Sequence, residues 1–257
     1  MNYHLFISLF IVSICLFSCG ERPSANNPKM PSAQELIDQA IALHGGELYD
    51  YSDISLTFRD KNYRSQREGG KFTYERSFVE EGMSYVDQMS SEAFERKING
   101  EVVFVQDTMV RKYRNSINSV WYFALLPYKL NDEAVNKKYL GVSEIDGKSY
   151  HKIEITFQEA GGGEDHQDIF VYFFDTESGH MDHLAYSYET DGGGLRFRKG
   201  YNFREVNGMR FADYVNFKGD PKMDVRDIDR AYFNQELDTL SLIELENVEL
   251  KSLVPQS

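Results

Sequence analysis

The body of this sequence has no cysteine that could form a disulfide, and it has fewer basic than acidic residues. Its two cysteines, Cys15 and Cys19, both stand near the start, so no disulfide can stabilise the body of the chain and no thiol can act there as a nucleophile. Basic residues are also scarce, because 28 Lys and Arg face 41 Asp and Glu, for a formal net charge of −13. Phosphate binding depends on clustered basic side chains, so nucleic acid is not an expected partner.

Long apolar stretches are scarce as well, and the one at residues 5–17 is interrupted by two serines. It is shorter than the roughly 20 residues that a membrane-spanning helix needs, and it has the length of a signal-peptide core. The sequence Leu-Phe-Ser-Cys-Gly at 16–20 resembles the bacterial lipobox, in which a small residue precedes an acylated cysteine. We therefore expect residues 1–18 to be removed and the acylated Cys19 to hold the protein on the outer membrane, facing the periplasm. A plain secretory signal is the alternative.

Residues 19–31 are polar and contain three prolines, which is typical of a flexible tether. Residues 32–257 show no linker and no internal repeat, so we expect one β-rich domain there. Its first element is a helix over 33–44, because Ser32 and Glu35 have the spacing of a capping box and two glycines follow His44. The apolar stripe of this helix requires a partner surface, most simply a sheet.

Alternation of apolar and polar residues then predicts half-buried antiparallel strands. The expected strands cover residues 54–58, 71–75, 83–88, 94–98, 102–105, 150–157, 169–175, 184–189, 195–203, 211–217 and 242–250. Asn99-Gly100 is a typical two-residue hairpin turn. Between the two groups of strands, helical spacing predicts a helix over 108–126, stopped by Pro127, and a short helix over 132–140. This order predicts an α+β fold, a single curved antiparallel sheet (half-barrel) whose concave face is covered by the N-terminal helix and the helical insertion.

The layout resembles the LolA-like lipoprotein-carrier fold, with its N-terminal amphipathic helix, incomplete antiparallel barrel and helical lid. The segments 58–63, 127–132 and 184–188 are also similar to those of an uncharacterised family of cell-envelope lipoproteins of this size. The resemblance covers about residues 34–250 and implies the fold, but it brings no catalytic residue. The soluble carrier is not lipidated, so the resemblance does not imply a shuttle across the periplasm.

Three groups of His and carboxylate residues, at 164–168, 180–183 and 224–229, have side chains that could bind a metal or transfer protons. His166 and His180 would lie roughly 30 Å apart along a hairpin, so they cannot share one ion. No CxxC, HExxH or DxDxDG pattern completes any group. We therefore expect no catalytic residue, no cofactor and no metal, and the weak candidate ligands His166, Asp168, His180 and Asp182 would lie on solvated strand ends. Arg226 and Arg230 indicate local ion pairing in the third group.

Aromatic side chains are abundant, at 14% of the chain, with 18 Phe and 17 Tyr but a single Trp. Residues 120–126 would be apolar on all sides of a helix, and 169–174 on both faces of a strand, which a solid core also explains. Under a helical lid these residues could instead line a cavity for a hydrophobic small molecule or lipid. The expected lining is Phe58, Tyr74, Trp121, Tyr122, Phe123, Leu126, Tyr172, Phe174, Tyr186, Tyr188 and Phe197. The alternatives are an envelope hydrolase that uses a His/carboxylate group, and a non-catalytic subunit of an envelope complex whose protein partner is unknown.

Overall fold

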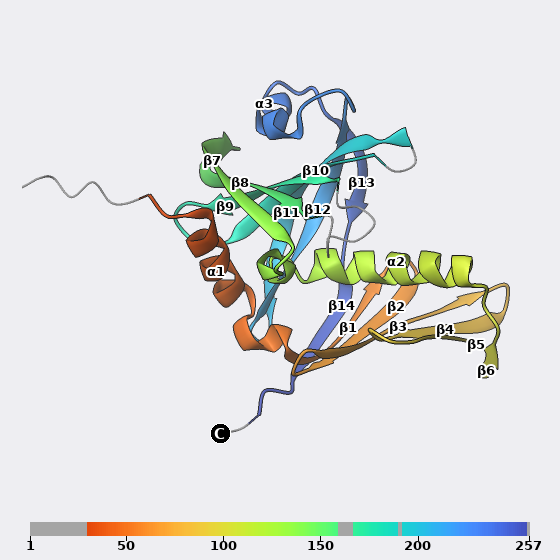
Figure 1. The fold of residues 1–257 in the computed structure, drawn as a ribbon. Coiled ribbons are helices and arrows are strands. Elements are labelled where there is room, and N and C mark those ends of the chain that lie inside the picture. Colours follow the sequence, from red (N-terminus) through yellow and green to blue (C-terminus); the bar gives the residue numbers. More distant parts are fainter. Residues whose placement is uncertain (1–29, 159–166, 190–191, 256–257) are drawn as a thin grey trace, which may run out of the picture. The chain divides into compact units, whose positions relative to one another are not determined.

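Fourteen strands of the described chain form two antiparallel sheets (Figure 1). The computed structural model describes residues 30–158, 167–189 and 192–255, and Pro31–Ser257 cluster as one unit. The expected signal peptide, Cys19 and most of the expected tether lie outside the described residues. Among the helices that are described, none has the length and apolar character needed to cross a membrane.

The N-terminal helix α1 (Ala33–His44) is confirmed, together with its capping box. The hydroxyl of Ser32 accepts a hydrogen bond from the Glu35 amide at 3.2 Å, and the Glu35 carboxylate accepts one from the Ser32 amide at 2.7 Å. Leu36, Ile37 and other residues of its apolar stripe are buried against the second sheet described below. A short 3-10 turn, η1 (Gly46–Tyr49), then leads into the first strand.

Sheet A contains the strands from the N-terminal half and the last strand of the chain, in the order β14-β1-β2-β3-β4-β5-β6. Their bounds are β1 Tyr51–Phe58, β2 Lys61–Glu68, β3 Lys71–Glu80, β4 Met83–Met89, β5 Phe94–Ile98, β6 Glu101–Val103 and β14 Glu246–Ser252. The turn at Asn99-Gly100 is confirmed, since φ is positive at both residues, 50° and 86°.

Sheet B contains the remaining strands in the order β13-β12-β11-β10-β9-β8-β7. Their bounds are β7 Val135–Ile145, β8 Lys148–Phe157, β9 Ile169–Asp175, β10 Met181–Tyr188, β11 Gly194–Val206, β12 Met209–Gly219 and β13 Asp238–Ile243. Both faces of this sheet are covered. One faces α1, and the other faces the short elements η4 (Val225–Asp227) and α3 (Ile228–Phe233).

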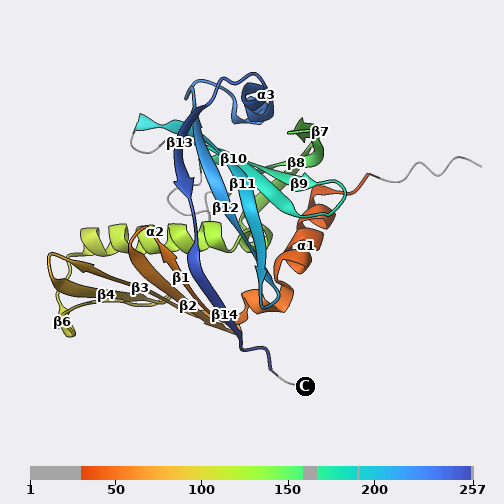
Figure 2. The same ribbon diagram turned by 180° about the vertical axis from the view of Figure 1, so that it is seen from behind.

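The helical insertion is α2 (Asp107–Ala124), which runs along the boundary between the sheets in both views (Figures 1 and 2). Ile117 and Trp121 are buried against sheet A, where Trp121 stacks on Tyr74 with ring centroids 5.6 Å apart. Tyr122 and Phe123 instead pack toward the core of sheet B. The predicted helix over 108–126 is therefore confirmed, and its two apolar faces serve two different sheets.

The predicted α+β half-barrel class, with its N-terminal helix and helical insertion, is confirmed, but its strands divide into two hydrogen-bonded sheets instead of one. The last predicted strand, 242–250, is two strands: β13 pairs with β12, and β14 pairs with β1. Only Glu244 and Leu245 separate them, so the chain changes partner sheet within two residues.

The short helix predicted over 132–140 is wrong, because residues 132–134 form a turn after the 3-10 helix η2 (Tyr128–Asn131) and residues 135–140 belong to β7. Local propensity favours a helix here, but pairing along the whole of β8 decides the conformation. Gly141, which suggested a helix end, lies at a register shift in the β7–β8 ladder with φ of 108°. It is a β-bulge glycine.

Candidate functional site

A cavity of about 360 Å³ lies between α2 and sheet B. We call it the Arg198 cavity. Its lining comes from the end of β1, the second half of α2, strands β10 to β12 and the segment around the β13–β14 junction. The lining residues are Phe58, Arg59, Ser119, Val120, Phe123, Ala124, Tyr186, Arg198, Ala212, Tyr214, Asn216, Ile243 and Leu245.

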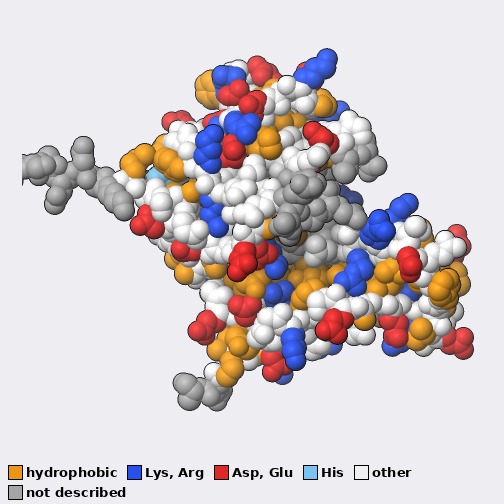
Figure 3. Space-filling model, viewed as in Figure 1, with side chains coloured by type: hydrophobic (Ala, Val, Ile, Leu, Met, Phe, Trp, Pro, Cys, Tyr) orange, Lys and Arg blue, Asp and Glu red, His pale blue; other side chains and the backbone are white. Residues whose placement is uncertain are grey.

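The local sequence explains why space remains here. Ala212, Tyr214 and Asn216 are alternate residues of β12 and therefore share the face toward α2. Ala212 on the strand and Ala124 on the helix are both small, so neither fills the gap between the two elements. Most of the wall is apolar or aromatic, which is the usual character of a ligand pocket. On the face seen in Figure 3, hydrophobic side chains gather along α2 with Lys and Arg side chains among them.

Arg198 brings a positive charge into this apolar space. Its guanidinium carbon lies 3.6 Å from the centroid of the Phe123 ring, and one terminal nitrogen donates to the Tyr186 hydroxyl at 3.1 Å. The Nε atom is buried without a hydrogen-bond partner. No carboxylate of the described residues is within ion-pair distance of Arg198. Burial raises the pKa of Tyr214 to about 12, and the charge of nearby Arg198 acts in the opposite direction.

Asn216 is the second polar group with unused bonding capacity in the cavity. It is 7% exposed, and its amide nitrogen donates a long hydrogen bond of 3.3 Å to the Ser241 hydroxyl. Its Oδ1 atom is buried without a partner. Asn216 is the direct cross-strand partner of Arg198 in the β11–β12 ladder. The two unsatisfied atoms therefore belong to neighbouring side chains on one face of the sheet.

A second cavity of about 280 Å³ lies on the other side of the end of α2. Tyr74, Trp121 and Tyr122 contribute to its wall, and Trp121 has its indole nitrogen buried without a partner. Lys129 and Asp132 form an ion pair at 3.3 Å in the same lining. This cavity is therefore smaller than the Arg198 cavity, and its wall carries both charge signs.

The structure separates the predicted lining residues into several places. Phe58, Phe123 and Tyr186 line the Arg198 cavity, and Tyr74, Trp121 and Tyr122 line the second cavity. Tyr188 lines a third, more open depression of about 600 Å³ at another edge of sheet B. The remaining predicted residues lie within cores: Leu126, Tyr172 and Phe174 are buried with α1, and Phe197 is buried on the opposite face of sheet B.

Sequence reasoning missed Arg198 and Asn216, the two polar groups of the main cavity. Arg198 alternates with the apolar residues Leu195 and Phe197, a pattern that normally assigns an arginine to the solvent face. Because both faces of sheet B are covered, the same alternation places Arg198 inside. The sequence offered one signal for this site. Arg198 is a basic residue next to buried Phe197 in a chain that is acidic overall.

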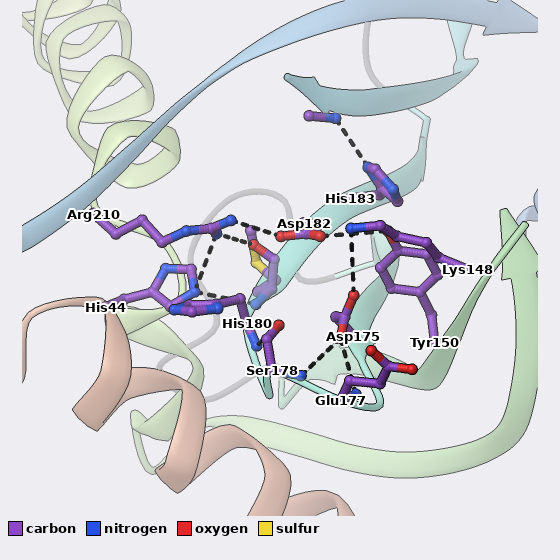
Figure 4. Close-up of polar contacts among 12 residues, drawn as sticks. His44, Lys148, Tyr150, Asp175, Glu177, Ser178, His180, Asp182, His183 and Arg210 are labelled. Carbon is purple, nitrogen blue, oxygen red and sulfur yellow. Dashed lines mark hydrogen bonds and ion pairs between the residues drawn. The ribbon is translucent and has the colours of Figure 1, made fainter. Parts of the chain in front are cut away.

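The predicted group at 180–183 is part of a structural network with α1 and β12 (Figure 4). Asp182 is 4% exposed and accepts hydrogen bonds from Arg210 at 2.8 Å and from the Tyr150 hydroxyl at 3.3 Å. His44 accepts one from the Met181 amide at 3.1 Å. The expectation of a solvated strand end is therefore wrong for Asp182, because the Arg210 guanidinium compensates its charge inside the fold.

The two buried histidines of this region act as hydrogen-bond acceptors. His183 accepts from the Gly200 amide at 3.0 Å. Burial lowers the pKa of His44 to about 3, with help from Arg210, and burial also lowers that of His183 to about 4. His180 is partly buried, with its ring 5.3 Å from that of His44. The imidazoles of His44 and His183 are therefore neutral near pH 7, and each has a ring nitrogen that accepts a structural hydrogen bond.

The remaining metal candidates give no assembled site. His166 lies outside the described residues. Asp168 is 8% exposed, so the expectation of a solvated strand end is wrong for this residue as well. Within the described parts of the chain, no three His, Cys, Asp or Glu side chains come together as a metal site. The expected local ion pairs of the third group are confirmed, Asp224 with Arg226 and Asp227 with Arg230 at 3.0 Å each.

Three of the solved structures that resemble this chain share 10% of its sequence. A LolA superfamily protein from Nitrosomonas europaea has a TM-score of 0.46, with 87% of this chain and 95% of that one covered. A domain described as an outer membrane lipoprotein-sorting protein, from Vibrio parahaemolyticus, has a TM-score of 0.45, with 88% and 94% covered. A DUF1329 family protein from Desulfovibrio piger has a TM-score of 0.38, with 88% and 95% covered.

No curated protein matches the chain. The family model described as "Family of unknown function (DUF6503)" matches residues 5–247. This match spans most of the 257 residues, and the chain therefore belongs to the DUF6503 family.

Proposed function

We propose that this protein is a membrane-anchored envelope lipoprotein that binds one hydrophobic or lipid-like ligand between sheet B and α2. The observation that carries the proposal is the Arg198 cavity, whose volume of about 360 Å³ falls within the usual range of small-molecule pockets. Its wall is largely apolar, including Val120, Phe123 and Ile243. Apolar walls that face empty space lose the packing contacts that a ligand would restore.

The packing of α2 supports a binding role for this side of the helix. Toward sheet A the helix buries Ile117 and Trp121 to 0% and 1% exposure. Val120 and Phe123, in contrast, are only partly buried and line the cavity. One face of α2 therefore fixes the helix, while the other leaves apolar surface that a ligand can cover.

The location follows from the N-terminal sequence. The lipobox-like segment at 16–20 makes Cys19 the proposed site of acylation, and residues 20–31 then form a tether to the folded part. The net charge of −13 disfavours adhesion to anionic headgroups, so the acyl chains supply the attachment. We place the protein on the outer membrane, facing the periplasm.

The test fills the cavity without adding charge. Ala212→Phe places a ring between β12 and α2, and the matched control Val142→Phe adds the same ring at a position that is 55% exposed. A fluorescent fatty-acid probe should bind the parent protein and the control equally, and Ala212→Phe at least about tenfold more weakly. Urea unfolding of all three proteins verifies that Ala212→Phe still folds. Equal binding of the probe to all three would refute this site, and no binding to the parent would refute the function.

A further inference from the structure

The chemistry of the Arg198 cavity indicates the class of ligand. The wall includes two cationic side chains, Arg198 inside and Arg59 at the exposed edge, and no carboxylate among its lining residues. This composition stands out in a chain with 41 acidic and 28 basic residues. The net charge of the chain repels an anion, whereas the two cationic side chains of this cavity attract one.

Three other arginines that are buried or half-buried have carboxylate partners. Arg76 and Arg96 both contact Asp87 at 2.6 Å, and Arg210 contacts Asp182 at 2.8 Å. Arg198 differs, because aromatic contacts with Phe123 and Tyr186 hold its guanidinium in place without neutralising it. The fold therefore orients a cation in an apolar setting, where no carboxylate lines the cavity.

Asn216 adds a second contact at the same point. Its unsatisfied Oδ1 atom belongs to the side chain directly across the ladder from Arg198. A half-turn of the amide exchanges its oxygen and nitrogen, so Asn216 can present either an acceptor or a donor to a bound group. Together the two side chains offer a polar end to a cavity that is otherwise lined by Phe58, Val120 and Ile243.

We propose that the ligand is an anionic single-chain amphiphile whose acid group pairs with Arg198 and Asn216 while its hydrocarbon chain lies along α2. This inference rests on the proposed function and narrows it to one ligand class. The volume of about 360 Å³ suits one chain, because it lies near the lower end of the range for ligand pockets. The acid can be a carboxylate, as in a fatty acid, or a phosphate, as in a lysophosphatidate. A guanidinium binds both through charge-assisted hydrogen bonds.

The experiment compares ligands with the same chain and different head groups on the full-length protein, held in an amphipathic polymer so that no detergent competes. Palmitate, palmitoyl lysophosphatidate and the neutral hexadecanol each displace a fluorescent probe from the parent protein. At least one acid should bind about 10- to 100-fold more tightly than the alcohol, the range expected for hydrogen bonds to a charged group. The acid that binds more tightly identifies the head group.

The variants locate this preference. Arg198→Gln should weaken binding of the acids far more than binding of hexadecanol, so that the advantage of the acid is lost. Arg196→Gln is the matched control, because Arg196 lies on the same strand and contacts the Tyr188 hydroxyl at 2.6 Å but does not line the cavity. If alcohol and acids bind the parent equally, the ligand class is wrong and the proposed function stands. If none binds, both are wrong. The comparison of ligands on the parent protein decides the matter even if Arg198→Gln does not fold.

Discussion

Asp87 should be among the most sensitive positions of the fold. This side chain is 0% exposed and accepts hydrogen bonds from Arg76 on β3 and Arg96 on β5, with closest distances of 2.6 Å. Arg76 also donates to the Ser116 hydroxyl, and the Arg96 guanidinium lies 3.7 Å from the centroid of the Tyr113 ring. The Asp87 ion pairs therefore hold the two arginines that attach α2 to sheet A.

Replacing Asp87 with Asn keeps the shape of the side chain and removes its charge. Two guanidinium groups, 5% and 9% exposed as residues, then lose the anion that compensates them. Breaking a buried pair in this way costs about 3–5 kcal/mol. With a urea dependence of about 2.5 kcal/mol per M for a domain of this size, the unfolding midpoint should fall by about 1–2 M.

Asp53→Asn is the matched control, because Asp53 pairs with Arg64 in the same sheet at the same distance of 2.6 Å. The Arg64 side chain is 50% exposed, so solvent screens that pair and its loss should cost at most about 1 kcal/mol. Urea unfolding followed by Trp121 fluorescence and circular dichroism measures both variants. An Asp87→Asn midpoint within about 0.4 M of that of Asp53→Asn would refute the reasoning.

Three further predictions concern pH, packing and attachment. The pKa values of His44 and His183 in the folded protein are about 3 and about 4, below the ordinary value of 6.5. The contribution of these two neutral histidines to the free energy of unfolding is therefore complete above pH 6.5 and should be lost as the pH falls toward 4. The loss is up to about 1.4 kcal/mol per pH unit for each histidine, and unfolding curves that do not change over this range would contradict it. Gly200→Ala should destabilise the protein by about 1–3 kcal/mol, because the added Cβ would lie 2.2 Å from the Asp182 carbonyl oxygen. Thermal unfolding measures the effect, and a Tm equal to that of the parent would show that β10 and β11 can move apart to accept the Cβ. Cys19→Ser should abolish metabolic labelling with palmitate and release the protein from washed membranes, whereas continued membrane retention would argue against acylation at this residue.

The sequence predicted correctly those elements whose conformation depends on contacts between residues close together in the chain. The capping box of α1 and the Asn99-Gly100 turn involve contacts between residues that are three or fewer positions apart, so they are visible in the sequence. The extent of α2 follows from its helical spacing and from Pro127. The failures involve distant partners: β7 has the local features of a helix, and only pairing with β8 makes it a strand. The change of sheet at Glu244 and Leu245 likewise depends on β1 and β12, which lie far away in the sequence.

The candidate site shows the same limit. Alternation correctly indicates that Phe197 and Arg198 lie on opposite faces of β11, but it does not say that both faces of the sheet are covered. The large aromatic residues were therefore good markers of burial and poor markers of the cavity. The space depends on small residues, Ala124 and Ala212, whose role becomes visible only when α2 is placed against β12.

The most direct test of the central claim, that the space between α2 and sheet B holds an acidic lipid, is the amount of such lipid that purifies with the protein. Protein extracted from membranes into an amphipathic polymer, washed and treated with organic solvent should release about one non-covalently bound acidic amphiphile per chain, measured by mass spectrometry against an internal standard. Ala212→Phe protein prepared in the same way should release far less. Parent protein that carries no such lipid, or equal amounts from the two proteins, would contradict the account.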